Sequence, residues 1–329
     1  MNHTATNNTR LRWNGSPVMY YMGNLMEMEA HMPSFVRQSF GLADLEKKLT
    51  RLNDRLHVIV RLPFDKDETA VPVGVVSKKY VLVQHTEVLN MAIQAFEAAQ
   101  FDPSALKAEL TMTEYGERMA LTVYLPEEYD YVPEQGDPMK LRLQCLNSVD
   151  GSTEFRAIMS WLRQVCSNGL TVGVTRYQMR RRHVGNIPME DLSEVLAWGI
   201  EESLEEMRHF DTWRRTPISF DQLEAWVDGP LRERWGFKAA TRAFHIALRG
   251  TDVDLVGSYK HNTPTRIAVR ETQRVPGVPE TSLTLFDMSQ ILAWLAKERL
   301  DIQEQFEWRE TIPELLASLM HEARPGFRW

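Results

Sequence analysis

The alternation of apolar and polar positions is most informative between Leu141 and Asn186. An apolar run up to Leu146 predicts a strand, and Asp150-Gly151 supplies a turn. Apolar residues then recur at helical spacing: Phe155, Ile158, Met159, Leu162, Val165 and Cys166. Ser152 or Thr153 can cap the first turn, and Asn168-Gly169 can end the last one. The pattern therefore predicts an amphipathic helix that begins at Thr153.

Positive charge gathers on the opposite face of this predicted helix and in the segment after it. Guanidinium groups bind phosphate through bidentate hydrogen bonds, and an aromatic ring such as that of Tyr177 offers a surface on which a base can stack. A second basic segment lies further along the chain. The predicted nucleic-acid-binding residues are Arg156, Arg163, Arg176, Tyr177, Arg180, Arg181, Arg182, His183, Lys260 and Arg266. The alternative is that these residues form ordinary solvated or salt-bridged surface.

The sequence pattern before Leu141 predicts a helix with strands before and after it in the chain. Thr86 caps a helix through Val88, Leu89 and Phe96, and residues rich in branched side chains precede and follow it. We expect a short charged helix over Leu42 to Leu52 and strands over 56–62, 71–83, 109–115, 118–125 and 139–146. The fold class predicted from this order is α+β, with an antiparallel β-meander packed on helices.

Beyond Pro188 the spacing is mostly helical. Helices are predicted over 191–210, 219–228, 238–248, 287–300 and 311–321, with linkers over 214–217 and 261–280. The predicted organisation is an N-terminal arm over residues 1–40, an α+β core domain over 41–187 and a mostly helical C-terminal region over 188–329.

Composition places the chain among ordinary globular proteins, since 43% of its residues are hydrophobic and 25% are charged. It has no run of about 18 apolar residues and no secretory signal at its N-terminus, so we expect a cytoplasmic protein without membrane contact. Cys145 and Cys166 are both expected to be buried and reduced.

The net charge of −7 argues against a surface covered in nucleic-acid-binding sites, although the local field decides binding. The basic block up to Asn186 is followed by an acidic helix from Glu190 to Glu206. The two blocks form either a binding groove beside an acidic wall or two surfaces that neutralise each other.

Motifs that would carry catalysis do not occur. The sequence contains no HExxH, no CxxC, no calcium loop, no Walker or GxGxxG loop and no GxSxG elbow. Acidic pairs such as Glu127-Glu128 are adjacent in exposed contexts, so they do not predict converging acid and base groups. We therefore expect no cofactor and no metal site, and the sequence carries no enzyme signature, which favours a non-catalytic protein without deciding the question.

Four segments resemble the phage- and plasmid-related prokaryotic family known as domain of unknown function 932. They are VGVVSKKYVLVQHTEVLN at 73–90, NSVDGSTEF at 147–155, VCSNGLTVG at 165–173 and RRRHVGN at 180–186. Val149 stands where histidine is expected in the family. The resemblance implies a context of mobile genetic elements, and it implies no particular activity.

The order of helix, meander and basic-faced helix is also similar to the single-strand annealing proteins related to the eukaryotic recombination mediator of the radiation-sensitivity group. That resemblance implies a ring-shaped homo-oligomer that holds single-stranded DNA in a basic groove.

The favoured hypothesis is a non-catalytic protein that binds and anneals single-stranded DNA during phage or plasmid recombination. The first alternative is a phage-encoded protein-interaction or anti-defence accessory module that uses the acidic helix, and the second is a metal-dependent nuclease.

Overall fold

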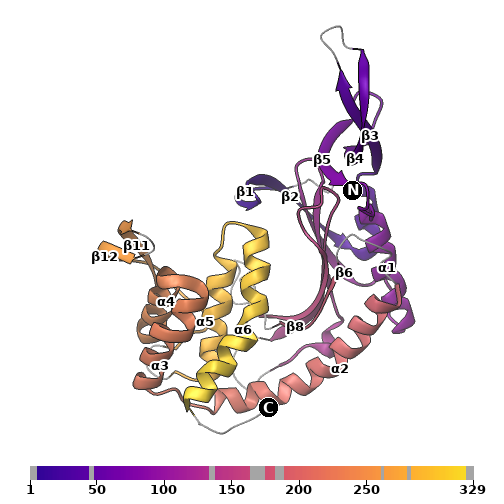
Figure 1. Ribbon diagram of the computed structural model, residues 1–329. Coiled ribbons are helices and arrows are strands. Elements are labelled where there is room, and N and C mark those ends of the chain that lie inside the picture. Colours follow the sequence, from indigo (N-terminus) through magenta and orange to yellow (C-terminus); the bar gives the residue numbers. More distant parts are fainter. Residues whose placement is uncertain are drawn as a thin grey trace. The chain divides into compact units, whose positions relative to one another are not determined.

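The computed structural model describes residues 6–43, 48–132, 138–163, 175–181, 189–260, 263–279 and 283–323. The chain forms two compact units, which are drawn in Figure 1. The N-terminal unit comprises Met1–Glu128, Arg142–Met159 and Tyr177–Glu201. The C-terminal unit comprises Tyr129–Leu141, Ser160–Arg176 and Glu202–Trp329.

The largest sheet has seven strands within the described residues, in the order β1-β2-β6-β7-β8-β9-β10. Its first five strands pair antiparallel. The bounds of the seven strands are β1 Thr6–Trp13, β2 Ser16–Asn24, β6 Lys107–Thr113, β7 Arg118–Tyr124, β8 Met139–Ser148, β9 Phe155–Arg163 and β10 Thr175–Arg181. Strands β1 and β2 come from the segment predicted to be an arm, so residues of that segment are part of the sheet.

One face of this sheet is apolar because alternate residues point to it. Ala108, Leu110 and Met112 on β6 are almost fully buried, as the two-residue period of a strand requires. Helix α1 (His85–Ala98) is tied to the sheet by His85, whose two ring nitrogens bond the Gly116 carbonyl at 2.7 Å and the Asn147 amide at 3.0 Å. The short helix η1 (Leu25–His31) follows β2, and η2 (Glu127–Tyr129) follows β7.

A smaller sheet of three strands, β3 (Phe35–Ala43), β4 (Leu49–Arg61) and β5 (Val71–Ser77), has the order β3-β4-β5. Phe35, Ile59, Val76, Tyr80 and Val149 form its core. Figure 1 shows β3 and β4 running together, away from the helix α1.

The C-terminal unit is built mainly of helices. After α2 (Met189–Arg214) come α3 (Phe220–Trp226), the π-helical turn η3 (Val227–Leu231), α4 (Arg232–Arg249), α5 (Leu285–Lys297) and α6 (Ile302–Ala323). Every residue from Leu285 to Ala296 is buried, so α5 is the centre of the unit. Between α4 and α5, strands β11 (Thr251–Lys260) and β12 (Thr263–Arg274) form an antiparallel hairpin.

The α+β class and the antiparallel meander β6-β7-β8 are confirmed. The helix predicted from Thr153 is wrong, because Phe155–Arg163 is strand β9. Every residue from Phe155 to Leu162 is buried. A strand that is covered on both faces shows no alternation, so its apolar residues match helical spacing by chance.

Two further predictions are wrong for a related reason. The expected helix over Leu42 to Leu52 is occupied by the ends of β3 and β4, and the expected linker over 261–280 contains β12. The β11-β12 hairpin leaves Val256 and Val269 more than half exposed. A ribbon with little buried surface gives no hydrophobic period, and only pairing with its partner strand makes it a strand.

Candidate functional site

The predicted binding residues lie on two separate sheets. Arg156 and Arg163 belong to β9, and Arg176, Tyr177, Arg180 and Arg181 belong to its neighbour β10. Lys260 ends β11, and Arg266 lies on β12 opposite Ser258, so these two share the hairpin. Arg182 and His183 lie outside the described residues. The described residues of the prediction thus form two groups, one on the neighbouring strands β9 and β10 and one on the hairpin β11-β12.

Arg156 is placed differently from the prediction. Its side chain was expected on the open face of a helix, yet Arg156 is only 8% exposed, and Ser160 on the same strand is 2% exposed. Strand β9 is enclosed, so this guanidinium interacts within the protein. Direct contact between Arg156 and a bound phosphate is therefore not supported.

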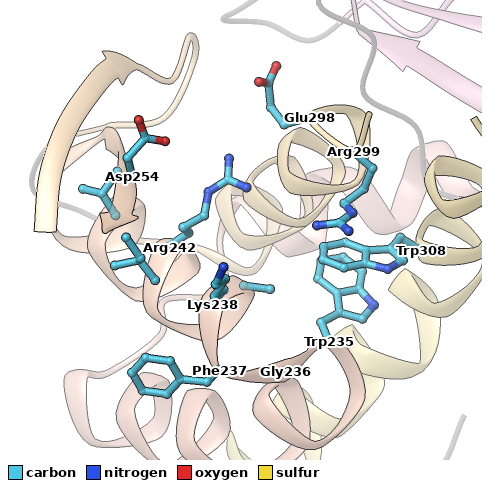
Figure 2. A pocket seen from close by; sticks show the side chains of 12 residues that line it. Trp235, Gly236, Phe237, Lys238, Arg242, Asp254, Glu298, Arg299 and Trp308 are labelled. Atoms are coloured by element: carbon cyan, nitrogen blue, oxygen red, sulfur yellow. The ribbon is translucent and has the colours of Figure 1, made fainter. Parts of the chain in front are cut away.

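A cavity of about 600 Å³ in the C-terminal unit forms a candidate site that the sequence did not indicate (Figure 2). Binding sites for small molecules commonly have volumes of this order. Its walls come from α4, β11, the segment after α5, and α6. The lining residues are Trp235, Gly236, Phe237, Lys238, Ala239, Arg242, Val253, Asp254, Leu255, Glu298, Arg299 and Trp308.

One wall is a stack of three flat groups. The indole rings of Trp235 and Trp308 are nearly parallel, at 19°, with their centroids 4.4 Å apart. The guanidinium carbon of Arg299 lies 4.6 Å from the Trp308 ring centroid. Figure 2 shows Arg299, Trp308 and Trp235 one above another. Cation–π attraction and the carboxylate of Glu304, which accepts from Arg299 Nε at 2.9 Å, fix the guanidinium at the rim.

The opposite wall carries Arg242, which a buried carboxylate holds in place. Arg242 donates from Nε to Asp252 at 2.8 Å and from a terminal nitrogen at 2.5 Å. Asp252 is 2% exposed and also accepts from Trp294 Nε1 at 2.8 Å. Burial would lower the pKa of Arg242, but the hydrogen bonds and charge of Asp252 raise it above its ordinary value. The guanidinium is therefore fixed and fully charged, with its remaining N–H groups beside the cavity.

The floor of the cavity is a break in α4 at Gly236. This residue has φ 84° and ψ 168°, a conformation that is almost confined to glycine. A Cβ atom at Gly236 would meet no heavy atom within 4 Å, so the backbone angle alone requires glycine there. The break separates the indole of Trp235 from the helix that carries Lys238 and Arg242.

Charges of both signs meet in this cavity. Lys238, Arg242 and Arg299 supply three positive charges to the lining, and Asp254 and Glu298 supply two negative ones. Asp252 and Glu304, which pair with Arg242 and Arg299, add two further negative charges, so the site has no excess of positive charge. Figure 2 shows Arg242 and Arg299 reaching toward the same space from different segments. Such an arrangement suits an anion of low charge that is held by guanidinium groups.

Sequence reasoning missed this site because its parts are far apart in the chain. Trp235 and Trp308 lie on different helices, and no periodic pattern links them. Gly236 lies between the helices predicted over 219–228 and 238–248, so it gave no local signal either.

The chain belongs to the family described as Domain of unknown function (DUF932), whose family model matches residues 72–292. No curated protein and no solved structure matches the chain. No helix among the described residues is long and apolar enough to cross a membrane. In the same part of the chain, no group of three or more histidine, cysteine or acidic residues is arranged to hold a metal ion.

Proposed function

We propose that the protein is a non-catalytic single-stranded DNA-binding protein whose C-terminal unit holds a backbone phosphate in the cavity beside Arg242. The observation that carries this proposal is the convergence of Lys238, Arg242 and Arg299 on one cavity, with both guanidinium groups fixed by carboxylates behind them. Fixed guanidinium groups lose little entropy when they bind phosphate.

The charge balance of the cavity selects among phosphate ligands. Asp254 and Glu298 on the lining, and Asp252 and Glu304 paired with Arg242 and Arg299, offset the three cations, so a ligand of high negative charge is disfavoured. A phosphodiester carries one charge, whereas a nucleoside triphosphate carries several. The cavity therefore suits a DNA backbone better than a free polyphosphate.

The single strand is favoured over the duplex by the shape of the site. The cations lie inside a cavity, lined in part by Phe237 and the Trp235–Trp308 stack, and a flexible single strand can bend a phosphate into it more easily than a duplex can. Annealing of complementary strands during phage or plasmid recombination, by a homo-oligomer, is the finer form of this proposal. It is supported by the family context that the sequence resemblance implies.

The test is the affinity of matched single-stranded and double-stranded oligonucleotides across a salt series, followed by fluorescence anisotropy. We expect tighter binding of the single strand and a linear fall of log K with log salt. The double variant Lys238→Gln with Arg299→Gln should bind more weakly and lower the magnitude of the slope by about 1.4, at about 0.7 for each lost contact with a single strand.

Arg234→Gln is the matched control. Arg234 lies on α4, its side chain is 54% exposed, and it does not line the cavity. This variant should keep the affinity and the slope of the unaltered chain. Equal affinity and slope for the folded double variant would refute the proposal, and mass measurements on the same samples would show whether an oligomer forms.

A second candidate function is favoured by one observation on α2. Trp198 is 58% exposed on this acidic helix, with Glu194 and Glu201 exposed beside it. Tryptophan is among the residues that dominate protein interfaces, so this face suits a partner protein with a basic surface. Stoichiometric co-purification of a host protein, lost on Trp198→Ala and without retained DNA, would support an interaction module instead.

A further inference from the structure

A second cavity, of about 210 Å³, lies in the N-terminal unit. It is formed by β2, η1, the turn between β6 and β7, and the residues that follow β4. Its lining residues are Met19, Tyr21, Ala30, His31, Pro33, Arg61, Phe64, Met112, Glu114, Tyr115 and Gly116. The predicted binding residues and the cavity beside Arg242 have no part in it.

The walls of this cavity are aromatic and partly exposed. The rings of Tyr21 and His31 are stacked, with centroids 4.1 Å apart and an angle of 18°. Phe64 and Tyr115 are 55% and 48% exposed. Exposed rings that border a cavity are favourable surfaces for a flat aromatic ligand, because stacking removes them from water.

The turn that carries Tyr115 is fixed by its glycine. Gly116 has φ 73°, and a Cβ atom there would come within 2.4 Å of Pro33 Cγ. The Gly116 carbonyl also accepts the bond from His85. Tyr115 is therefore held at the edge of the cavity by a backbone that only glycine permits.

Two charged side chains of opposite sign add directional contacts. Arg61 bonds Glu68 at 3.3 Å through one terminal nitrogen, and its side chain is 11% exposed. Glu114 is exposed at the end of β6. The cavity thus offers hydrogen-bond donors from a guanidinium and acceptors from a carboxylate.

We propose that this cavity binds a guanine base. A carboxylate can accept from both N1–H and the N2 amino group of guanine, and a guanidinium can donate to O6 and N7. Adenine has no such pair of donors on that edge. An organic cation would also suit the aromatic walls, and choline is the probe for that alternative.

Guanine can come from a free nucleoside or nucleotide or from a DNA strand, and the chemistry of the base is common to both. The inference goes beyond the proposed function, because it concerns a different unit and a neutral base. Guanosine, which has no phosphate, is therefore the first probe.

Binding of guanosine, inosine, adenosine and choline to the full chain is measured by calorimetric titration and by saturation-transfer NMR. We expect guanosine to bind, and inosine and adenosine to bind about tenfold more weakly or worse, because inosine lacks the N2 donor and adenine lacks both. An oligonucleotide with one guanine among thymines, compared with an all-thymine strand, then shows whether the site also takes the base from a strand.

Glu114→Gln should weaken guanosine binding about tenfold, since an amide replaces one acceptor by a donor. Phe64→Ala should weaken all flat ligands. The matched controls are Glu97→Gln, an exposed acid on α1, and Phe220→Ala, an aromatic residue with 53% exposure in the other unit. Both controls should bind guanosine as the unaltered chain does.

Equal binding of all nucleosides, binding of choline in place of guanosine, or no binding of guanosine would each overturn the inference. The double variant at Lys238 and Arg299 separates the two proposals. It should lose affinity for an all-thymine strand and keep its affinity for guanosine, so either proposal can fail while the other stands.

Discussion

Asp252 is the residue whose loss should most affect the C-terminal unit and the cavity beside Arg242. Its carboxylate, 2% exposed, accepts two hydrogen bonds from Arg242, one from Trp294 Nε1 and one from the Val253 N–H at 2.7 Å. These bonds join α4, α5 and β11. We therefore predict a large loss of stability for Asp252→Ala.

The expected loss of stability depends on the uncompensated charge of Arg242 that remains after the substitution. Breaking a buried ion pair by removing one partner costs about 3–5 kcal/mol, because the other charge remains buried. The side chain of Arg242 is 21% exposed beside the cavity, so water can solvate part of the uncompensated guanidinium. The expected decrease in the free energy of unfolding is therefore in the lower half of that range, about 3–4 kcal/mol.

A thermodynamic cycle with Arg242→Met isolates the pair. The double variant no longer contains a buried charge, so its loss should be smaller than the sum of the two single losses by about 1–3 kcal/mol. Asp254→Ala is the control on the same strand. Its ion pair with Arg270 is exposed, at 55% and 73% for the two side chains, and its loss should be below about 1 kcal/mol.

Urea unfolding followed by tryptophan fluorescence measures these changes, because most of the tryptophans, among them Trp226, Trp235, Trp294 and Trp308, lie in the C-terminal unit, whereas Trp13 and Trp198 lie in the N-terminal unit. Since the chain has two units, the transition reported by tryptophan is fitted separately from the total circular dichroism signal. If Asp252→Ala lost no more than Asp254→Ala, with an unchanged m value, the reasoning about the buried carboxylate would be refuted.

Two further predictions concern the backbone and a buried thiol. Gly236→Ala should lower the free energy of unfolding by about 1–3 kcal/mol, because the φ of 84° at Gly236 is almost confined to glycine. Gly229 has open space around it and an ordinary φ, so Gly229→Ala should not destabilise the chain in the same urea experiment. Equal losses of stability in the two variants would contradict this prediction. Burial raises the pKa of the Cys145 thiol to about 12, so in a Cys166→Ser chain it should stay neutral at mildly alkaline pH and react with a thiol reagent only after unfolding. Rapid stoichiometric labelling of the folded chain would show that Cys145 is accessible.

The sequence by itself determined most helices and the strands that clear turn residues separate. Helices α1, α2, α4 and α6 were predicted because burial on one side leaves a helical period in the sequence. The meander β6-β7-β8 was predicted because branched residues and turn residues alternate over short distances.

Only the tertiary structure decided strand β9 and the hairpin β11-β12. Strand β9 is buried on both faces and the hairpin β11-β12 is largely exposed, so neither carries a period that identifies it. Arg156 and Arg163 were assigned to a helix face for this reason, and Arg156 is instead buried in a strand.

Both candidate sites also depend on contacts between distant residues. Trp235 stacks on Trp308, and Arg61 and Tyr115 line one cavity, through packing that no local pattern encodes. Local sequence records which side of an element faces water, whereas a cavity is defined by the elements that pack around it, and these come together only when the chain folds.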